Sequence, residues 1–488
     1  MVWTGDSARH DNDEQIPRTP DEIVDLNDYM ARQWVGLFGL RDNIGVPGSV
    51  PRVSVPVVPT FGNNDMTPHN ILRPGPNMWT KRFAEVWRHF IPEDQRHSFV
   101  EGGWFTSEVI PGQLAIISMN TMYFYDSNSA VDGCSDKSEP GYEHMEWLRV
   151  QLQLLRERNM KAILTGHVAP ARSDEKTSWD ETCWQKYTLW IDRYRDVVVG
   201  SLYGHMNIDH FILQDTHTVD LDEALSGGKL SARSKTDYLS SLREQWSSLP
   251  SPPEDLATEW DGFEEDDEAE ISPSKKGKKG KKGKGKKEKK RRKFLKNIGG
   301  PLAERYSVSL VSPSLVPNYF PTLRVIDYNT TGLVDSPTSV GEPHETPVDI
   351  EKKKKKKPDF KEPEAPSPIS PPGPAYSNQA LTWLRYTQFF ANLTRSNAAA
   401  AAHQDLDPRV DFEVEYSTDD EIYRMPDLTV RSFFELAVRI GKDDKASSQD
   451  HDAGMNKKKR VNEVWRAFLS RAFTGFLDVD EMDEVEAL

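Results

Sequence analysis

The sequence is poor in cysteine and has no long apolar run. Only Cys134 and Cys183 occur among its 488 residues, which excludes a disulfide framework but leaves a single bridge open. No stretch approaches the ~20 consecutive apolar residues of a membrane-spanning helix, and no signal-peptide pattern follows Met1. We therefore expect neither a membrane span nor a cleaved leader within the sequence as given.

The sequence also contains few hydrophobic residues, and its acidic residues outnumber its basic ones. The hydrophobic share is 36%, the mean hydropathy is −0.67, and the net charge is −15 with a pI of about 5.4. So acidic a chain is not a general nucleic-acid-binding protein, and no specific nucleic-acid partner is expected. The hydrophobic deficit is local, because the first half is rich in Trp, Tyr, Phe and Val. That half can build the core of one large domain.

Short apolar runs bounded by turn residues predict the strands of that domain. They cover residues 53–59, 114–118, 162–164 and 197–199, and two more cover 307–311 and 322–326. Between them, Leu148, Leu152 and Leu155 share one face of a predicted helix. The alternation predicts an α/β domain over residues 1–250, and residues 301–334 are expected to return strands to the same domain.

Two low-complexity segments divide the rest of the chain. Residues 251–300 join an acidic run to a Lys-rich run and predict a disordered insertion, because such residues cannot bury enough apolar surface to offset chain entropy. Residues 335–375 form a Lys/Pro-rich linker. Residues 376–488 are predicted to be helical. Their apolar stripe over 461–476 packs on the core or, as the alternative, meets a membrane surface or a partner.

Four short polar motifs each follow a predicted strand. They are Gly5-Asp6, Gly62-Asn63-Asn64-Asp65, Gly166-His167 and Gly204-His205-Met206-Asn207. Each alone is compatible with an ordinary turn, but ligand crevices form where strands end, and glycine allows close backbone approach. Carboxylate, amide and imidazole donors without a thiolate suit hard or borderline divalent cations, and two such ions can clamp a displacement at phosphorus. Together, the motifs predict one shared metal site.

The order of these motifs resembles the calcineurin-like metallophosphoesterase family. Longer strings resemble the fungal endopolyphosphatases and, less closely, the acid-sphingomyelinase branch; they span 3–11, 58–72, 163–170 and 203–211. The resemblance implies a two-sheet sandwich flanked by helices. It also implies metal-dependent hydrolysis of phosphoanhydride bonds within inorganic polyphosphate, giving shorter chains. The implied cofactors are two divalent ions, with Mn, Zn, Fe, Mg or Co all compatible.

The resemblance also implies residue roles. Five side chains would bind metal, with the first bridging two ions: Asp6, Asn63, His167, His205 and Asn207. His10 would act as the general acid, while a hydroxide held between the cations would attack phosphorus. Arg9, beside the first motif, and Asn64, where most relatives have a catalytic His, are candidate substrate contacts.

The resemblance further implies an Asp-x-His pair ahead of the Gly-Asp motif. Only four residues precede Gly5, so we expect an N-terminally truncated sequence. With Asp6 and Asn207 as the remaining ligands of one ion, this chain is expected to be inactive or nearly so.

The family resemblance also bears on location. It implies the lumenal domain of a type II single-pass vacuolar membrane protein whose anchor lies upstream of Met1. There, the sequons at Asn329 and Asn392 would be glycosylated, and Cys134 and Cys183 could form a disulfide.

The sequence is compatible with other functions. A sphingomyelinase-like phosphodiesterase and a catalytically dead scaffold are the rival functions. The Lys-rich run is interpreted as a solvated insertion, with a polyanion tether or a nuclear-localisation patch as alternatives. Oligomeric state, preferred metal and chain-length preference are not predicted.

Overall fold

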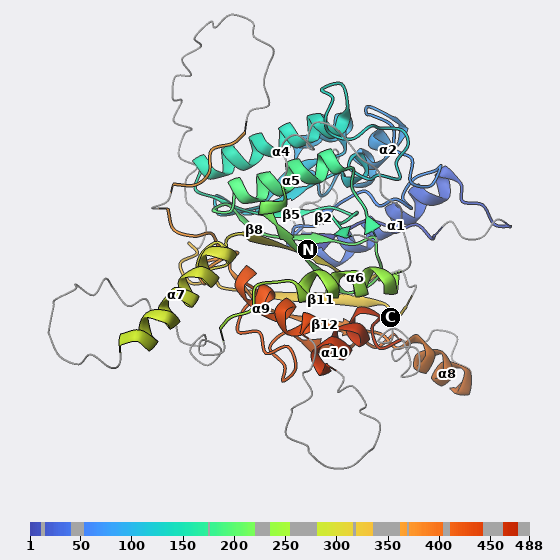
Figure 1. The fold of residues 1–488 in the computed structure, drawn as a ribbon. Coiled ribbons are helices and arrows are strands. Elements are labelled where there is room, and N and C mark those ends of the chain that lie inside the picture. Colours follow the sequence, from blue (N-terminus) through green and yellow to red (C-terminus); the bar gives the residue numbers. More distant parts are fainter. Residues whose placement is uncertain are drawn as a thin grey trace, which may run out of the picture.

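The computed structural model describes most of the chain. The described residues are 1–10, 15–40, 53–173, 176–219, 235–253, 281–315, 319–334, 362–367, 370–403, 410–442 and 462–476. A central sheet lies between α4 and α5 on one side and α6, α9 and α10 on the other (Figure 1). The bounds of these helices are α4 Pro140–Glu157, α5 Glu181–Arg193, α6 Lys235–Ser247, α9 Val430–Gly441 and α10 Glu463–Ala472. The α/β class predicted from the sequence is confirmed.

The central sheet has six strands in the order β3-β4-β5-β8-β10-β9. Their bounds are β3 Phe105–Ile110, β4 Leu114–Ser118, β5 Lys161–Thr165, β8 Val198–Tyr203, β10 Tyr306–Val311 and β9 His210–Asp215. The four inner strands run parallel, and the two edge strands run antiparallel to their neighbours. The inner strands are the apolar runs predicted from the sequence. Such runs suit parallel strands because helices cover both faces of the sheet.

The predicted helix faces are also present. Leu148, Leu152 and Leu155 of α4 are buried. In α10, Trp465 and Phe468 are each 2% exposed, so this part of the predicted apolar stripe packs on the core, whereas Phe476 at its end is 51% exposed and Val461 lies outside the described residues. Within the described residues, every helix falls short of the length and apolar content that a bilayer crossing requires.

A second, three-stranded sheet corrects two predictions. It contains β11 Thr322–Tyr328, β12 Trp383–Phe390 and β13 Glu413–Ser417, all antiparallel. The β11 strand therefore does not return to the central sheet, and residues 376–488 are not helical throughout. Because β12 pairs with strands from distant parts of the chain, its pairing could not be predicted from local periodicity.

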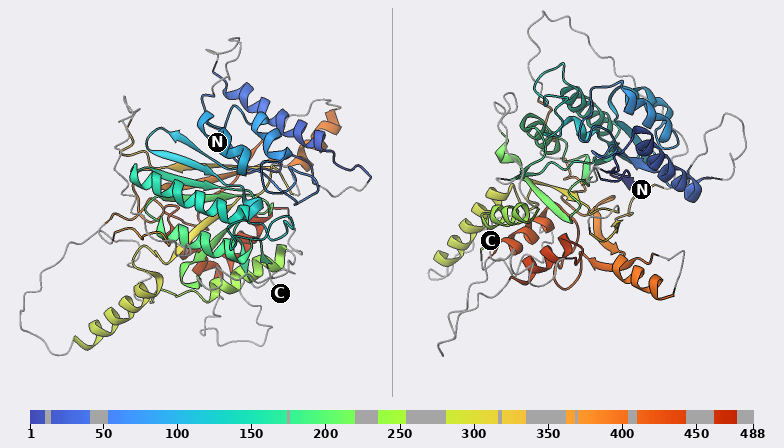
Figure 2. Two further views of the ribbon diagram at one scale, coloured as in Figure 1. Left: turned by 90° about the horizontal axis from the view of Figure 1, so that it is seen from above. Right: turned by 90° about the vertical axis from the view of Figure 1, so that its right-hand side faces the viewer.

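The Lys-rich insertion also differs from prediction. Residues 254–280 lie outside the described residues, but Lys281–Ile298 forms helix α7, which projects away from the layers (Figures 1 and 2). Lys, Arg and Glu are good helix formers. The helix is anchored by Phe294 and Ile298, which are buried in a cluster with Tyr306 and Phe434. Of the predicted linker, residues 335–361 and 368–369 lie outside the described part.

The remaining elements are short or peripheral. Three further helices stand at the amino-terminal side of the fold, and α8 projects outward (Figure 2). Their bounds are α1 Pro20–Phe38, α2 Met78–Val86, α3 Arg96–Gly102 and α8 Leu393–His403, and the two-residue strands are β1 Val2–Trp3, β2 Val58–Pro59, β6 Arg172–Ser173 and β7 Lys176–Thr177.

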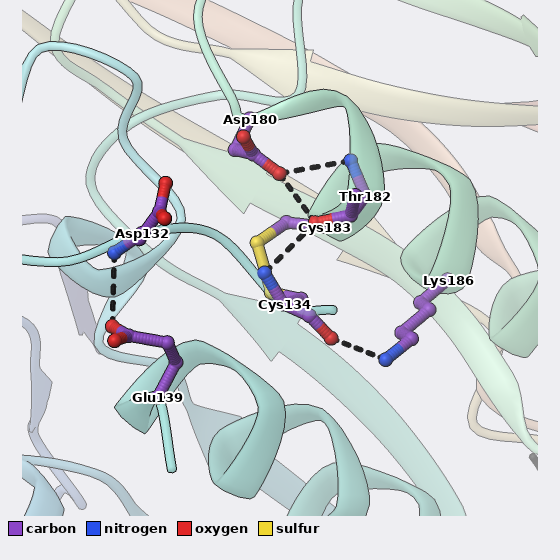
Figure 3. The surroundings of a disulfide bond; sticks show 7 residues. All are labelled: Asp132, Cys134, Glu139, Asp180, Thr182, Cys183 and Lys186. Atoms are coloured by element: carbon purple, nitrogen blue, oxygen red, sulfur yellow. Dashed lines mark hydrogen bonds between the residues drawn. A yellow bond between two sulfur atoms is a disulfide. The ribbon is translucent and has the colours of Figure 1, made fainter. Parts of the chain in front are cut away.

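A disulfide joins Cys134, in the loop before α4, to Cys183 in the first turn of α5 (Figure 3). The backbone N–H of Cys134 donates to Thr182 Oγ1 at 2.8 Å, and Lys186 Nζ donates to the Cys134 carbonyl. Asp180 caps α5 by accepting from the Thr182 N–H at 2.9 Å. The bridge that the cysteine count left open is thus present, and it ties together the two helices on one face of the central sheet.

Candidate active site

Two short strands bring the first two motifs together. Strand β1 pairs in parallel with β2, with Val2 opposite Val58, so the loops after both strands leave the same edge. A Cβ on Gly62 would lie 2.2 Å from the backbone nitrogen of Asp6. Only glycine permits so close an approach, which explains why the second motif begins with it.

A buried carboxylate holds these loops in place. Asp65 accepts hydrogen bonds from the backbone N–H groups of Asp6 (2.7 Å), Ser7 (3.0 Å), Ala8 (3.2 Å) and Gly62 (2.9 Å). Asn27 of α1 donates to the same carboxylate at 2.9 Å. The sequence motif contains Asp65, but its position alone indicates no role. The structure shows that it organises both loops.

The last two motifs follow parallel neighbours of the central sheet. His167 comes after β5 and His205 after β8, and the N–H of Gly204 donates to the His167 carbonyl at 2.9 Å. His205 and Asn207 have φ values of 70° and 57°, in the left-handed region that side chains with a Cβ rarely adopt. The backbone of this loop is therefore strained, and contacts with surrounding residues must maintain its conformation.

Four of the predicted side chains meet at one point. Asn63 Oδ1 lies 2.8 Å from His167 Nε2 and 2.9 Å from His205 Nδ1. His167 Nε2 also lies 3.2 Å from Asp6 Oδ2. Asp6 is 8% exposed and His167 is 1% exposed, so this convergence is largely shielded from solvent.

The charges of Asp6 and His167 are coupled. Burial alone would raise the pKa of Asp6, but His167 and two hydrogen bonds from Asn64, at 2.8 and 2.9 Å, outweigh it and lower this pKa. Burial likewise opposes protonation of His167, yet the Asp6 carboxylate raises the pKa of the imidazole. The pair is therefore stable as a carboxylate beside a cation.

The donor atoms suit a bound cation. His167 Nδ1 lies 2.6 Å from the Thr4 carbonyl, which fixes its proton on that nitrogen. The Nε2 atom then faces the Asn63 and Asp6 oxygens, so three electron-pair donors converge. Either a second proton on His167 or a metal ion can relieve their repulsion. Carboxylate, amide and imidazole donors fit Mn, Zn, Fe, Mg or Co.

An amide oxygen is part of this donor set. Within the described residues, no three His, Cys, Asp or Glu side chains gather closely enough to hold a metal ion by themselves. At this point the amide oxygen Asn63 Oδ1 lies within 2.9 Å of a nitrogen of both His167 and His205.

The remaining predicted residues lie in different places. Asn207 Nδ2 is 3.5 Å from His10 Nε2, so the fifth ligand candidate and the acid candidate lie side by side. Arg9 instead donates to Glu22 Oε1 at 2.9 Å, and its side chain is held against the start of α1. Asn64 is 2% exposed and donates to Asp6, so it positions a carboxylate where a substrate contact was predicted.

Three residues near the site were not identified as site residues from the sequence. Arg18 is buried and donates to the Asn64 carbonyl at 2.5 Å, which links the segment before α1 to the second motif. His69 Nε2 lies 2.8 Å from Asn63 Nδ2, and the Tyr125 ring lies 5.1 Å from that of His205. Only His69 had a signal, because it falls within the family-like string 58–72.

Comparison with known proteins identifies the family. No protein-family model matches the chain. It is 43% identical to the endopolyphosphatase of Neurospora crassa, over 91% of this chain and 68% of that protein. It is 35% identical to the endopolyphosphatase of Debaryomyces hansenii over 91% and 67% of the two chains, and 33% identical to that of Saccharomyces cerevisiae over 90% and 72%. The converging motifs and this extended similarity show that the chain belongs to the fungal endopolyphosphatase family.

Proposed function

We propose that this protein hydrolyses phosphoanhydride bonds within inorganic polyphosphate and releases shorter chains. Its relatives carry the name endopolyphosphatase. The observation that carries the chemistry is the position of Asn63 Oδ1, within 2.9 Å of both His167 and His205, with His167 Nε2 in turn 3.2 Å from Asp6 Oδ2.

Two divalent cations are the proposed cofactors, held by Asp6, Asn63, His167, His205 and Asn207. When bound, such ions supply Lewis acidity and offset the negative charge that develops on phosphoryl oxygens. This role suits polyphosphate, because each unit of the substrate carries negative charge.

The residues of the chain itself hold this arrangement. Asn64 and Asp65 fix Asp6, and the Thr4 carbonyl orients His167. His10, beside Asn207, is proposed to donate a proton to the departing phosphate. A polyphosphate chain is already a good leaving group, so the amide at Asn64 is compatible with catalysis although it cannot supply a titrating proton.

The test is an assay of the purified 488-residue chain on long polyphosphate with each divalent metal, with products sized on gels. Internal cleavage gives intermediate lengths. The variants Asn63→Ala and His205→Ala should abolish cleavage, whereas exposed His97→Ala should not. Preferred hydrolysis of a phosphodiester over polyphosphate would contradict the proposal.

Cleavage is not the only readout of the proposed metal centre. Mn²⁺ binding then provides a separate measurement. Binding that is lost in His167→Ala supports the centre without turnover, whereas absence of Mn²⁺ binding would contradict it.

The vacuolar lumen is the proposed location, with glycosylation at Asn329 and Asn392. The Cys134–Cys183 disulfide supports passage through an oxidising compartment. Both asparagines are partly exposed. Vacuole fractionation and a gel shift by endoglycosidase, lost in the double variant Asn329→Gln, Asn392→Gln, test the location and the modification.

A further inference from the structure

We propose that Asp209 and Arg324 are positioning residues for the active site. The His205 loop, residues 204–209, carries His205 and Asn207. Arg324 of β11 binds the carboxylate of Asp209 at the end of this loop, with Arg324 Nη2 2.6 Å from Asp209 Oδ1. Through this ion pair, the three-stranded sheet holds a loop of the active site in place. This inference rests on the proposed metal-dependent function.

The two ends of the His205 loop are held by different parts of the fold. At its start, the Gly204 N–H donates to the His167 carbonyl at 2.9 Å. At its end, Asp209 accepts from Tyr416 OH at 2.5 Å, in addition to Arg324. The Asp209 N–H donates to the Ala472 carbonyl of α10 at 2.9 Å. Strands β11 and β13 and helix α10 therefore hold the end of the loop.

The loop needs such support because of its backbone. His205 and Asn207 both adopt left-handed φ values, which L residues with side chains disfavour. Two such residues within three positions persist only where surrounding contacts impose them. Asp209 lies two residues after Asn207 and supplies those contacts through its side chain and its N–H.

The ion pair is buried and geometrically fixed. The side chains of Asp209 and Arg324 are 3% and 6% exposed. Arg324 also donates from Nε to Gln388 Oε1 at 3.0 Å, and its guanidinium lies 4.0 Å from the Tyr386 ring centroid. Removal of either charge leaves its partner buried without its counter-charge, so the loop end would move to relieve it. Groups that orient metal ligands in this way typically change metal affinity when they are removed.

The test compares two arginines on one sheet. Arg324→Gln removes the buried partner of Asp209. Arg385→Gln is the matched control, because Arg385 of β12 pairs at the surface with Asp327 (2.7 Å) and Asp419 (3.3 Å). Mn²⁺ affinity of the full chain is measured by calorimetry. We expect Arg324→Gln to bind Mn²⁺ about ten- to a hundredfold more weakly, and Arg385→Gln to bind as the wild type does.

Two further variants separate positioning from general stability. Arg324→Lys keeps the charge and should recover part of the lost affinity. Tyr416→Phe keeps the ion pair and removes one hydrogen bond, so it should fold cooperatively and show a smaller loss. If Arg324→Gln fails to fold, Tyr416→Phe decides the question. Wild-type Mn²⁺ affinity in folded Arg324→Gln, or in Tyr416→Phe where Arg324→Gln is unfolded, would overturn the inference.

The test also separates this inference from the proposed function. If the wild-type chain binds Mn²⁺ but does not cleave polyphosphate, the substrate proposal fails, while weaker Mn²⁺ binding in Arg324→Gln still supports the positioning role. If the wild-type chain binds no Mn²⁺, both proposals are overturned.

Discussion

The carboxylate of Asp65 accepts a hydrogen bond at 2.7 Å from the backbone N–H of Asp6, a residue 59 positions away. The same carboxylate also accepts from Ser7, Ala8 and Gly62. One buried anion thus fixes both loops that bring Asp6 and Asn63 to the site. It also explains how Asp6 is kept at φ 58°, in the left-handed region.

Replacing Asp65 with Asn should destabilise the protein. The side-chain amide of Asn has one acceptor oxygen, whereas the same N–H donors now share the two oxygens of the Asp65 carboxylate. The NH₂ group of Asn would also face N–H groups, to which it cannot hydrogen-bond. We expect the free energy of unfolding to fall by about 2–4 kcal/mol, as measured by urea denaturation. Exposed Asp132→Asn is the control and should stay within about 0.5 kcal/mol of wild type. An equally small change in Asp65→Asn would show that Asp65 is not the anchor.

Gly62→Ala should impair the site while the fold remains. Its methyl group would lie 2.2 Å from both the N and Oδ1 atoms of Asp6, so the carboxylate must move. We expect about a hundredfold slower polyphosphate cleavage, with weaker Mn²⁺ binding as a second readout.

The control for this variant is Gly36→Ala in α1, where an added Cβ meets nothing within 4 Å. It should keep wild-type activity and gain up to about 1 kcal/mol in stability from helix propensity. Full activity and Mn²⁺ affinity in Gly62→Ala would contradict the close packing of the two loops.

Loss of the disulfide should lower stability without changing the site. Cys134 and Cys183 are 49 positions apart, and closing a loop of that size restricts the unfolded chain by about 4 kcal/mol. We expect a decrease of this order on reduction or in Cys134→Ser, Cys183→Ser, measured by denaturation. Reductant should have no further effect on the double variant. Identical oxidised and reduced stabilities of wild type would disprove the contribution.

His144 should make stability depend on pH. Its ring stacks between Trp104, at 4.4 Å, and Phe124, at 4.9 Å, and burial lowers the pKa of His144 to about 3. The unfolded chain therefore takes up a proton below about pH 6.5 that the folded protein excludes. This contribution is complete above pH 6.5 and is lost as pH falls, by about 1.4 kcal/mol per unit until about pH 3.

The measurement is the free energy of unfolding from pH 7 to 4 for wild type and His144→Gln. Glutamine retains an acceptor for the Asn120 N–H, which donates to His144 Nε2 at 3.2 Å. The variant should show a shallower acid slope, by about one proton. Exposed His97→Gln serves as the control. Parallel curves for wild type and His144→Gln would contradict the neutral buried state.

Much of the site could be predicted because its signals are local. A β-branched run, a glycine and a polar side chain in succession indicate a loop at a strand end, as for His167 after β5. The close approach of the Gly62 backbone to Asp6, in contrast, joins residues far apart in the sequence and only the structure shows it. Arg18 gave no such signal, because a buried arginine has the same sequence appearance as an exposed one. The partner of Arg9 gave no such signal either, since Glu22 belongs to the following helix.

The sequence by itself determined the four inner strands of the central sheet, the apolar faces of α4 and α10, the four motifs and the family resemblance, but not the edge strands β3 and β9. Tertiary structure decided which side chains the motifs would face, and it paired β11, β12 and β13 into a separate sheet. It also brought Arg324 to Asp209, 115 positions away. The hydrophobic periodicity of a segment indicates only which of its side chains are buried and which are exposed. It does not indicate which other segment covers the buried side chains. Contacts between distant segments are selected by packing of the whole chain.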